Sequence, residues 1–323
     1  MGQQEPQPED TAPGRIVASH GRRVLLEDAA GRRLPCGLFG RDLKVVCGDR
    51  VRWRPAEAEG ALGLVVAVEP RRTVLSRLNM AGAGEPVVAN LDRLVAVIAP
   101  VPAPDLELCD RYLAAAEWAG LEAAVVLNKR DLPGAADPAL ARALDAYRRL
   151  GYPVATASKR EAGGTDELAR LLGRGTSVLV GQSGVGKSSL TNRLVPGIDA
   201  AVQEVSSGTQ EGRHTTTASV LYRLPGGGEL IDSPGVRDYA PPLPAPRDVA
   251  SGFREIAAAG RRCRFPDCHH RGEPGCAVEP AAAAGELDGR RLSSYRQLLR
   301  LAEEFAARAR TKGPPRPGRG VRR

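Results

Sequence analysis

The segment from Gly181 to Ser188 reads G-Q-S-G-V-G-K-S and matches the pattern G-x-x-x-x-G-K-[S/T]. It follows the apolar run T-S-V-L-V and precedes a stretch typical of a helix, which is the context this pattern requires. Glycines let backbone N–H groups curve around phosphate oxygens, and a helix N-terminus adds positive potential. We expect Lys187 to neutralise the β- and γ-phosphates and Ser188 to offer its hydroxyl to Mg²⁺. The predicted phosphate-binding residues are Gly181, Gln182, Ser183, Gly184, Val185, Gly186, Lys187, Ser188 and Ser189.

A second polar group, Asn128-Lys129-Arg130-Asp131, follows the apolar run A-A-V-V-L. An aspartate there can accept hydrogen bonds from the N1–H and exocyclic amine of guanine, and adenine lacks this donor pair. Lys129 can pack its stem over the base. The run Ala157-Ser158-Lys159 resembles the S-A-K loop that supports a guanine base, with its first two residues exchanged; backbone N–H groups can do that work in either order. The predicted base-binding residues are Asn128, Lys129, Asp131, Ala157, Ser158 and Lys159.

The tetrapeptide Asp232-Ser-Pro-Gly235 follows the apolar run G-E-L-I. An aspartate at the end of a buried strand suits a position near Mg²⁺, and the Gly235 amide could sense a γ-phosphate. Residues 203–217, Q-E-V-S-S-G-T-Q-E-G-R-H-T-T-T, are typical of a mobile switch loop. Among its threonines we favour Thr216 as the Mg²⁺ ligand, with Thr215 as the alternative; both are also ordinary residues for a β-strand.

The residue after this tetrapeptide differs from the one that Ras-like enzymes use in catalysis. Ras-like enzymes place a water-orienting glutamine there, whereas this chain has Val236, which cannot orient water. His214, beside the threonines, is the candidate catalytic residue. The alternative is a histidine that only packs the switch. A His214→Ala variant that binds GTP normally but hydrolyses it slowly would support the catalytic role.

The order of these motifs is itself informative. A Ras-like protein runs phosphate loop, switch I, D-x-x-G, N-K-x-D and S-A-K, whereas here N-K-R-D and A-S-K precede the phosphate loop. The sequence therefore predicts a circularly permuted P-loop GTPase domain that binds GTP or GDP. The segment after Gly235 leads directly towards a C-terminal Cys/His cluster. We therefore expect the nucleotide state to reposition that region, which comparing GTP-analogue and GDP complexes would test.

Three cysteines and two neighbouring histidines stand close together near the C-terminal end: Cys263, Cys268, His269, His270 and Cys276. Three thiolates and one imidazole within 14 residues suit a closed tetrahedral Zn²⁺ site of the structural kind. A redox pair or unrelated cysteines are the alternatives. The remaining cysteines are scattered along the chain, and we expect them to be inert: Cys36, Cys47 and Cys109.

The elements around these motifs divide the chain into parts. Residues 14–75 read as short strands separated by Gly-containing turns, which predicts a small β-barrel such as an OB-fold, either binding oligonucleotides or purely structural. Residues 76–242 alternate buried strands with helices and predict an α/β domain. Residues 243–307 predict a small zinc-binding domain with a C-terminal helix. Residues 1–13 and 308–323 are expected to be disordered tails.

Composition excludes several classes of protein. Hydrophobic residues make up 42% of the 323, which is typical of a globular chain. No apolar run is long enough to span a membrane, and the acidic start does not resemble a signal peptide, so we expect a soluble cytoplasmic protein. Much of the formal net charge of +8 lies in residues 308–323, which hold seven basic residues and no acidic one. This arm favours a phosphate-rich partner, or it only solubilises the terminus.

Together these motifs resemble the ribosome small-subunit-dependent GTPase A family (RsgA-type). The matching segments are N-K-R-D at 128–131, G-Q-S-G-V-G-K-S at 181–188, G-R-H-T-T-T at 212–217, D-S-P-G-V at 232–236 and the spacing C-x4-C-x-H-x5-C. The resemblance covers roughly residues 14–307. By its pattern His270, rather than His269, joins the three cysteines as a zinc ligand.

The resemblance implies a bacterial cytoplasmic enzyme that acts in late maturation of the small ribosomal subunit. It implies GTP hydrolysis stimulated by that subunit, release of late assembly factors, and contacts of the barrel and the zinc domain with rRNA. We expect a monomer with no membrane association. Two other functions stay open: a nucleotide-gated RNA-binding protein whose hydrolysis is incidental, and an RNA-binding module that has lost nucleotide binding. The intact Lys187, Ser188, Asp131 and Asp232 disfavour the second.

Overall fold

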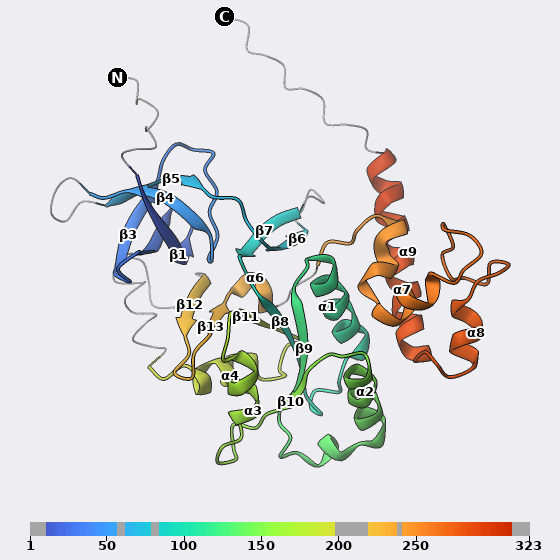
Figure 1. Ribbon diagram of the computed structural model, residues 1–323. Helices are drawn as coiled ribbons and strands as arrows, with labels where there is room; N and C mark the ends of the chain where they lie inside the picture. Colours follow the sequence, from blue (N-terminus) through green and yellow to red (C-terminus); the bar gives the residue numbers. More distant parts are fainter. Residues whose placement is uncertain (1–10, 57–61, 79–83, 198–218, 238–240, 312–323) are drawn as a thin grey trace, which may run out of the picture. The chain divides into compact units, whose positions relative to one another are not determined.

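The computed structural model describes residues 11–56, 62–78, 84–197, 219–237 and 241–311. The chain divides into two compact units, Met1–Pro242 and Leu243–Arg323 (Figure 1). Most of the two predicted tails lies outside the described residues, and so does the predicted switch loop with His214, Thr215 and Thr216.

Five strands at the N-terminal end form a closed barrel. β1 pairs with both β2 and β4, so the order β1-β2-β3-β5-β4 returns to its start. Alternate residues such as Ile16, Leu26 and Val51 point inward and are fully buried, as the two-residue period of a strand requires. This five-stranded barrel confirms the predicted OB-fold. Its strands are β1 (Ala12–His20), β2 (Arg23–Asp28), β3 (Arg33–Leu38), β4 (Arg50–Arg54) and β5 (Gly63–Val68).

A hairpin of β6 (Val74–Leu78) and β7 (Gly84–Ala89) connects the barrel to a second sheet. This sheet has the order β10-β9-β8-β11-β13-β12, in which all neighbours are parallel except β12 and β13. The alternation of strands and helices confirms the predicted α/β class. The strands are β8 (Arg93–Ile98), β9 (Glu122–Leu127), β10 (Val154–Thr156), β11 (Thr176–Val180), β12 (Ser219–Arg223) and β13 (Glu229–Asp232).

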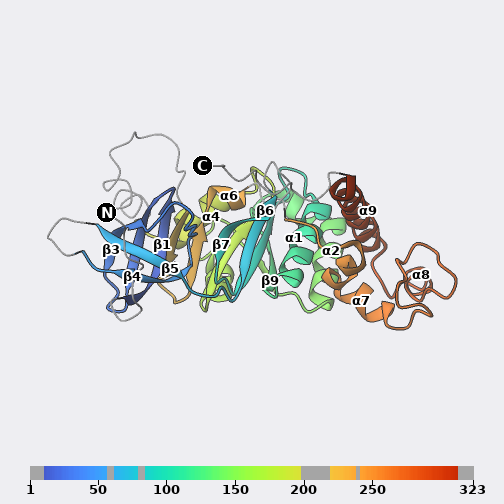
Figure 2. The same ribbon diagram turned by 90° about the horizontal axis from the view of Figure 1, so that it is seen from above.

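Helices cover both faces of this sheet, as Figures 1 and 2 show. α1 and α2 pack on one face in a core that includes Tyr112 and Tyr147, and α3 and α4 pack on the other with Leu168 and Leu190. Strands buried on both faces read as continuous apolar runs, and β9 accordingly has the buried run A-A-V-V-L after its first residue, Glu122. The helices of this unit are α1 (Leu106–Trp118), η2 (Pro133–Ala136), α2 (Pro138–Arg149), α3 (Asp166–Leu172), α4 (Lys187–Leu194) and α6 (Pro234–Arg237).

The barrel and the second sheet are joined edge to edge. β1 also pairs with β12 in antiparallel fashion, with Ser19 opposite Ser219. Beside this pairing, Arg15 donates hydrogen bonds to both carboxylate oxygens of Glu229 at 2.9 and 2.7 Å and to the hydroxyl of Thr176 at 3.0 Å. The barrel is therefore anchored where β11 and β13 begin.

The second unit is small and mainly helical. The guanidinium of Arg291 is buried against Glu255, with Nε 2.5 Å from Oε1, and lies over the ring of Phe253. This pair ties α9 to α7. The helices are η3 (Pro246–Gly252), α7 (Arg254–Gly260), α8 (Val278–Ala283) and α9 (Gly289–Thr311). In the described part of the chain, none of the helices has the length and apolar character of a membrane span.

Candidate functional site

The predicted nucleotide motifs stand at one edge of the second sheet. β9, β10, β11 and β13 all lie in its parallel part, so their carboxyl ends meet at the same edge. β9 ends at Leu127, directly before N-K-R-D, and β10 ends at Thr156, directly before A-S-K. β11 ends at Val180, directly before the phosphate loop, and β13 ends at Asp232, the first residue of D-x-x-G. Ligands of open α/β sheets bind at this edge. Permuting the chain order therefore leaves the spatial arrangement of the motifs intact.

The phosphate loop has a backbone shape that depends on glycine. Gly181, Gly184 and Gly186 have φ angles of 150°, 81° and 97°. A Cβ atom on Gly186 would lie 2.5 Å from Nδ2 of Asn128, and one on Gly181 would lie 2.3 Å from the carbonyl oxygen of Val97. Neither position has space for a side chain, which explains why glycine stands there.

The first two residues of α4, Lys187 and Ser188, carry a charged and a polar side chain. The Nζ atom of Lys187 donates to the carbonyl oxygens of Gly181 at 2.6 Å and Gln182 at 3.0 Å, so the ammonium group lies inside the curve of its own loop. Ser188, in the first turn of the helix, is exposed. A loop that holds a cation beside a helix N-terminus fits the phosphates of a nucleotide.

The N-K-R-D segment is hydrogen-bonded directly to the phosphate loop. Nδ2 of the buried Asn128 donates to the carbonyl oxygen of Val185 at 2.8 Å. Nζ of Lys129 donates to the carbonyl oxygens of Gly184 at 2.7 Å and Val101 at 2.6 Å. The sequence suggested only that the Lys129 stem packs over the base. The structure adds a bridging role for its ammonium group.

Asp131 lies at the same edge of the sheet, and one of its carboxylate oxygens accepts a hydrogen bond within the protein. The hydroxyl of Ser158 donates to Oδ1 at 2.6 Å, and Nη1 of Arg160 lies 3.8 Å from Oδ2. The Ser158 hydrogen bond, with the charges of Arg160 and Lys129, lowers the pKa of Asp131, which keeps the carboxylate ionised and able to accept. The exchanged order of A-S-K therefore matters: Ser158 contacts Asp131, whereas Ala157 is fully buried and Lys159 is exposed. Sequence reasoning missed this contact and Arg160.

The D-x-x-G tetrapeptide begins at the end of β13, which pairs with β11, the strand before the phosphate loop. Asp232 is the last residue of β13. A Cβ atom on Gly235 would lie 2.7 Å from Cγ1 of Val87, so the chain passes close to the β6–β7 hairpin. Val236 is 1% exposed and packs in the core on the α1–α2 face. Its inward orientation is consistent with the absence of a water-orienting side chain at that position.

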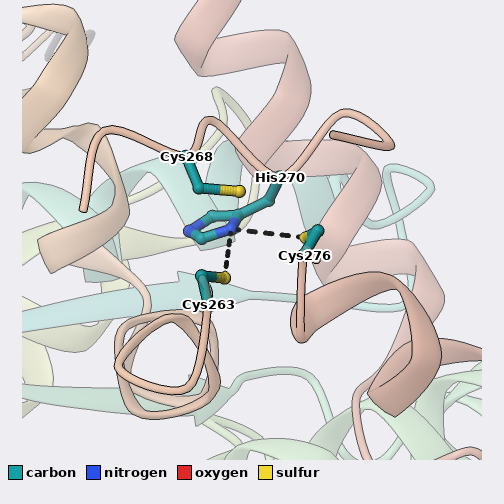
Figure 3. A group of neighbouring side chains, drawn as sticks. All are labelled: Cys263, Cys268, His270 and Cys276. Carbon is teal, nitrogen blue, oxygen red and sulfur yellow. Dashed lines mark hydrogen bonds between the residues drawn. The ribbon is translucent and has the colours of Figure 1, made fainter. Parts of the chain in front are cut away.

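The four predicted zinc ligands converge in the second unit (Figure 3). The ligand atoms of Cys263, Cys268, His270 and Cys276 all lie within 4.8 Å of one another. Nδ1 of His270 is 3.6 Å from Sγ of Cys263 and 3.7 Å from Sγ of Cys276. Tetrahedral zinc sites with three thiolates and one imidazole separate their ligand atoms by about 3.5–3.8 Å, so this donor set fits a metal ion.

The structure also distinguishes the two neighbouring histidines. His270 is 4% exposed and points into the cluster, whereas Nδ1 of His269 lies 3.6 Å from Oε1 of Glu303 on α9. Burial lowers the pKa of His270, which favours the neutral ring that a metal requires. The choice of His270 by family pattern is therefore supported by geometry.

Residues that the sequence did not single out hold this loop in shape. Glu273 accepts the backbone N–H groups of His269 at 2.8 Å and Arg271 at 2.6 Å. From α9, the Tyr295 hydroxyl donates to the carbonyl oxygen of His269 at 3.0 Å, and Arg296 donates to that of His270. Such outer contacts orient metal ligands, and no short motif would have identified them.

A phosphate loop, a guanine-type aspartate and a D-x-x-G at one sheet edge, in this chain order, define the circularly permuted P-loop GTPases. Residues 68–240 match the family model described as RsgA GTPase, and the chain belongs to that family. It is 45% identical over 291 residues to a small ribosomal subunit biogenesis GTPase RsgA of Azotobacter vinelandii, covering 88% of this chain and 84% of the relative. It is 44% identical over 296 residues to a protein of the same name from Pseudomonas aeruginosa strain LESB58, covering 90% and 85%.

Solved structures agree with this assignment. The crystal structure of YjeQ from Thermotoga maritima matches with a TM-score of 0.72 and 30% identity, covering 90% of this chain and 98% of that one. YloQ, described as a circularly permuted GTPase, matches with a TM-score of 0.70 and 22% identity, covering 94% and 98%, and supports the fold alone. The predicted family, fold class and GTPase activity are thus confirmed.

Proposed function

We propose that this GTPase acts in late maturation of the small ribosomal subunit and that the subunit stimulates its GTP hydrolysis. The observation that carries the nucleotide part is the direct link, through Lys129, between the phosphate loop and the loop that bears Asp131. The ribosomal part is supported by relatives at 44–45% identity that are named small ribosomal subunit biogenesis GTPases.

In this proposal the guanine base is read by Asp131, whose ionised carboxylate accepts from N1–H and the exocyclic amine. Ser158 holds that carboxylate in place through its hydroxyl. Adenine lacks this donor pair, so ATP would leave the base-facing side of the carboxylate without a partner, and polar groups left unpaired in a binding site discriminate strongly. Asn128, Lys129, Ala157 and Lys159 complete the base-binding side.

The phosphate loop, Gly181 to Ser189, would hold the phosphates, with Lys187 neutralising the β- and γ-groups. Ser188 and Thr216, with Asp232 nearby, would hold Mg²⁺, which supplies charge stabilisation for phosphoryl transfer. Gly235 would sense the γ-phosphate through its amide. The exposed hydroxyl of Ser188 at the first turn of α4 supports this arrangement.

For hydrolysis, a side chain must orient the attacking water, and Val236 cannot. We assign this step to His214. Because Val236 stands where Ras-like enzymes have a water-orienting glutamine, we expect slow GTP turnover by the protein alone and faster turnover on the subunit.

We further propose that Cys263, Cys268, His270 and Cys276 hold Zn²⁺ as a structural ion. Three thiolates and one imidazole form a complete tetrahedral set with no open position. The ion would fasten the loop of residues 263–276 and make the second unit a rigid body. The barrel and this unit would then contact rRNA. The protein would act as a cytoplasmic monomer without membrane association.

The experiment is hydrolysis of GTP and of ATP, each with and without purified small ribosomal subunits. Turnover restricted to GTP that rises sharply with the subunit supports the proposal. Turnover of GTP that the subunit leaves unchanged would remove the ribosomal assignment and leave the GTPase.

The buried Val236 favours one second candidate, a nucleotide-gated RNA-binding protein whose hydrolysis is incidental. A His214→Ala variant that binds GTP but does not hydrolyse it separates the two functions. If that variant still supports subunit maturation in cells, hydrolysis is incidental; if maturation stops, hydrolysis is required.

A further inference from the structure

The loop that follows β10 has little support from the sheet. β10 has three residues, Val154–Thr156, lies at the end of the strand order and pairs with β9. Ser158, which contacts Asp131, lies just beyond this short edge strand. Contacts outside the sheet must therefore fix the loop if Ser158 is to stay in place.

Arg130, the third residue of N-K-R-D, supplies such contacts. Its Nε donates to Oε2 of Glu161 at 2.6 Å, and its Nη1 donates to the hydroxyl of Thr156 at 3.0 Å. Nη1 also lies 3.9 Å from Oε1 of Glu167 on α3. The backbone N–H of Arg130 donates to the carbonyl oxygen of Ala157 at 3.1 Å. One residue thus holds the start of the loop, its middle and the helix that follows.

The partners of Arg130 are fixed in turn. Oε2 of Glu167 accepts both the backbone N–H and the hydroxyl of Thr156, at 2.7 and 2.9 Å. Within the loop, Ser158 N–H donates to Gly164 at 2.7 Å and Gly164 N–H donates to Glu161 at 3.1 Å. Moving Glu161 therefore moves Gly164, and with it the backbone of Ser158.

We propose that Arg130 is a positioning residue for guanine specificity, because its guanidinium holds the loop that places the Ser158 hydroxyl on Asp131. The inference rests on the proposed guanine site. Arg130 acts through the loop, with its side chain directed at Glu161 and Thr156. A guanidinium presents several donors in a fixed fork, which a single ammonium cannot reproduce across two separate acceptors.

The test compares the affinities of the protein for GDP and for IDP. IDP lacks the 2-amino group that would donate a hydrogen bond to Asp131. Arg130→Gln should weaken GDP binding about fivefold, the range expected for a partly exposed ion pair with hydrogen bonds, and weaken IDP binding less. The GDP:IDP preference should therefore fall. The GDP:IDP preference of Arg130→Lys should lie between those of the wild type and Arg130→Gln. Glu161→Gln should also lower the GDP:IDP preference.

Arg148→Gln is the matched control, since Arg148 makes an exposed ion pair with Asp145 on α2 at 2.7 Å, outside the base loops. It should leave the GDP:IDP preference unchanged. With Arg130→Glu, the partner change Glu161→Arg should restore part of the preference.

An equal loss of GDP and IDP affinity in Arg130→Gln would overturn the inference, because a merely structural role weakens both alike. No loss would overturn it as well. If instead the wild-type protein binds GDP no better than IDP or ADP, the proposed guanine site itself fails. The two failures are therefore distinguishable.

Discussion

The ammonium group of Lys129 lies 2.7 Å from the carbonyl oxygen of Gly184, so the N-K-R-D segment is attached directly to the phosphate loop. A second hydrogen bond, to Val101 at 2.6 Å, extends the bridge to the segment after β8. Three loops that are distant in the sequence are thereby held together by one side chain. Loss of this bridge should therefore affect both the phosphate loop and the N-K-R-D segment.

Removing this bridge should weaken nucleotide binding. Lys129→Ala eliminates two charge-assisted hydrogen bonds, so we expect the affinity for GDP to fall by about tenfold, or roughly 1.4 kcal/mol. Fluorescence titration with a labelled GDP measures this loss. Lys44→Ala, an exposed lysine in the N-terminal region, should have no effect. Unchanged affinity in Lys129→Ala would show that the bridge does not support the site.

The two adjacent histidines should behave differently towards zinc. His270→Gln removes the imidazole that faces the three thiols, so metal content should drop from one zinc per chain to a small fraction. His269→Gln alters a side chain that faces Glu303 instead, and it should keep its zinc. Elemental analysis after dialysis checks both variants. Equal zinc contents would contradict the ligand assignment.

Chelation should destabilise the second unit in particular. Because metal binding in such small domains contributes directly to folding, removing the ion should expose the loop of residues 263–276 to proteolysis. The barrel and the α/β domain have large apolar cores of their own and should stay protected. Limited proteolysis with and without chelator measures the difference. Uniform loss of protection would contradict a local structural role.

The buried pair of Arg291 and Glu255 should be costly to break. Arg291→Ala leaves a carboxylate buried without its partner, so we expect a loss of about 3–5 kcal/mol in the free energy of unfolding of the second unit. Arg262→Ala, which removes an exposed pair with Glu286, should cost about 0–1 kcal/mol. Denaturant titration compares them. Equal costs would show that the burial of Arg291 is not important.

The sequence predicts most of the site because its chemistry constrains local backbone shape. Gly181 and Gly186 are recognisable as a motif since no other residue fits their surroundings. Contacts that join distant segments have no such local signature. The pairing of Ser19 with Ser219 and the ion pair of Arg15 with Glu229 connect residues about 200 positions apart, and only the folded chain reveals them.

Side-chain partners show the same limit on a smaller scale. From the sequence, the exchange of the first two residues in Ala157-Ser158-Lys159 is expected to matter little if backbone N–H groups support the base. The structure shows that the Ser158 hydroxyl donates to Asp131, so the position of the serine in this segment does matter. Arg130 occupies the variable position of its motif, and its contacts with Glu161 and Thr156 could not be inferred from spacing.

The central claim is that Asp131 reads guanine, and calorimetric titration with GDP and XDP tests it most directly. Xanthine carries an oxygen where guanine carries its exocyclic amine, so an Asp131→Asn variant, whose amide can donate, should prefer XDP. We expect this variant to lose GDP affinity by about 100-fold or more and to gain affinity for XDP. Asp137→Asn, at the start of α2, should keep the wild-type preference. If Asp131→Asn still prefers GDP as strongly as the wild type, Asp131 does not read the base and the assignment of the site is wrong.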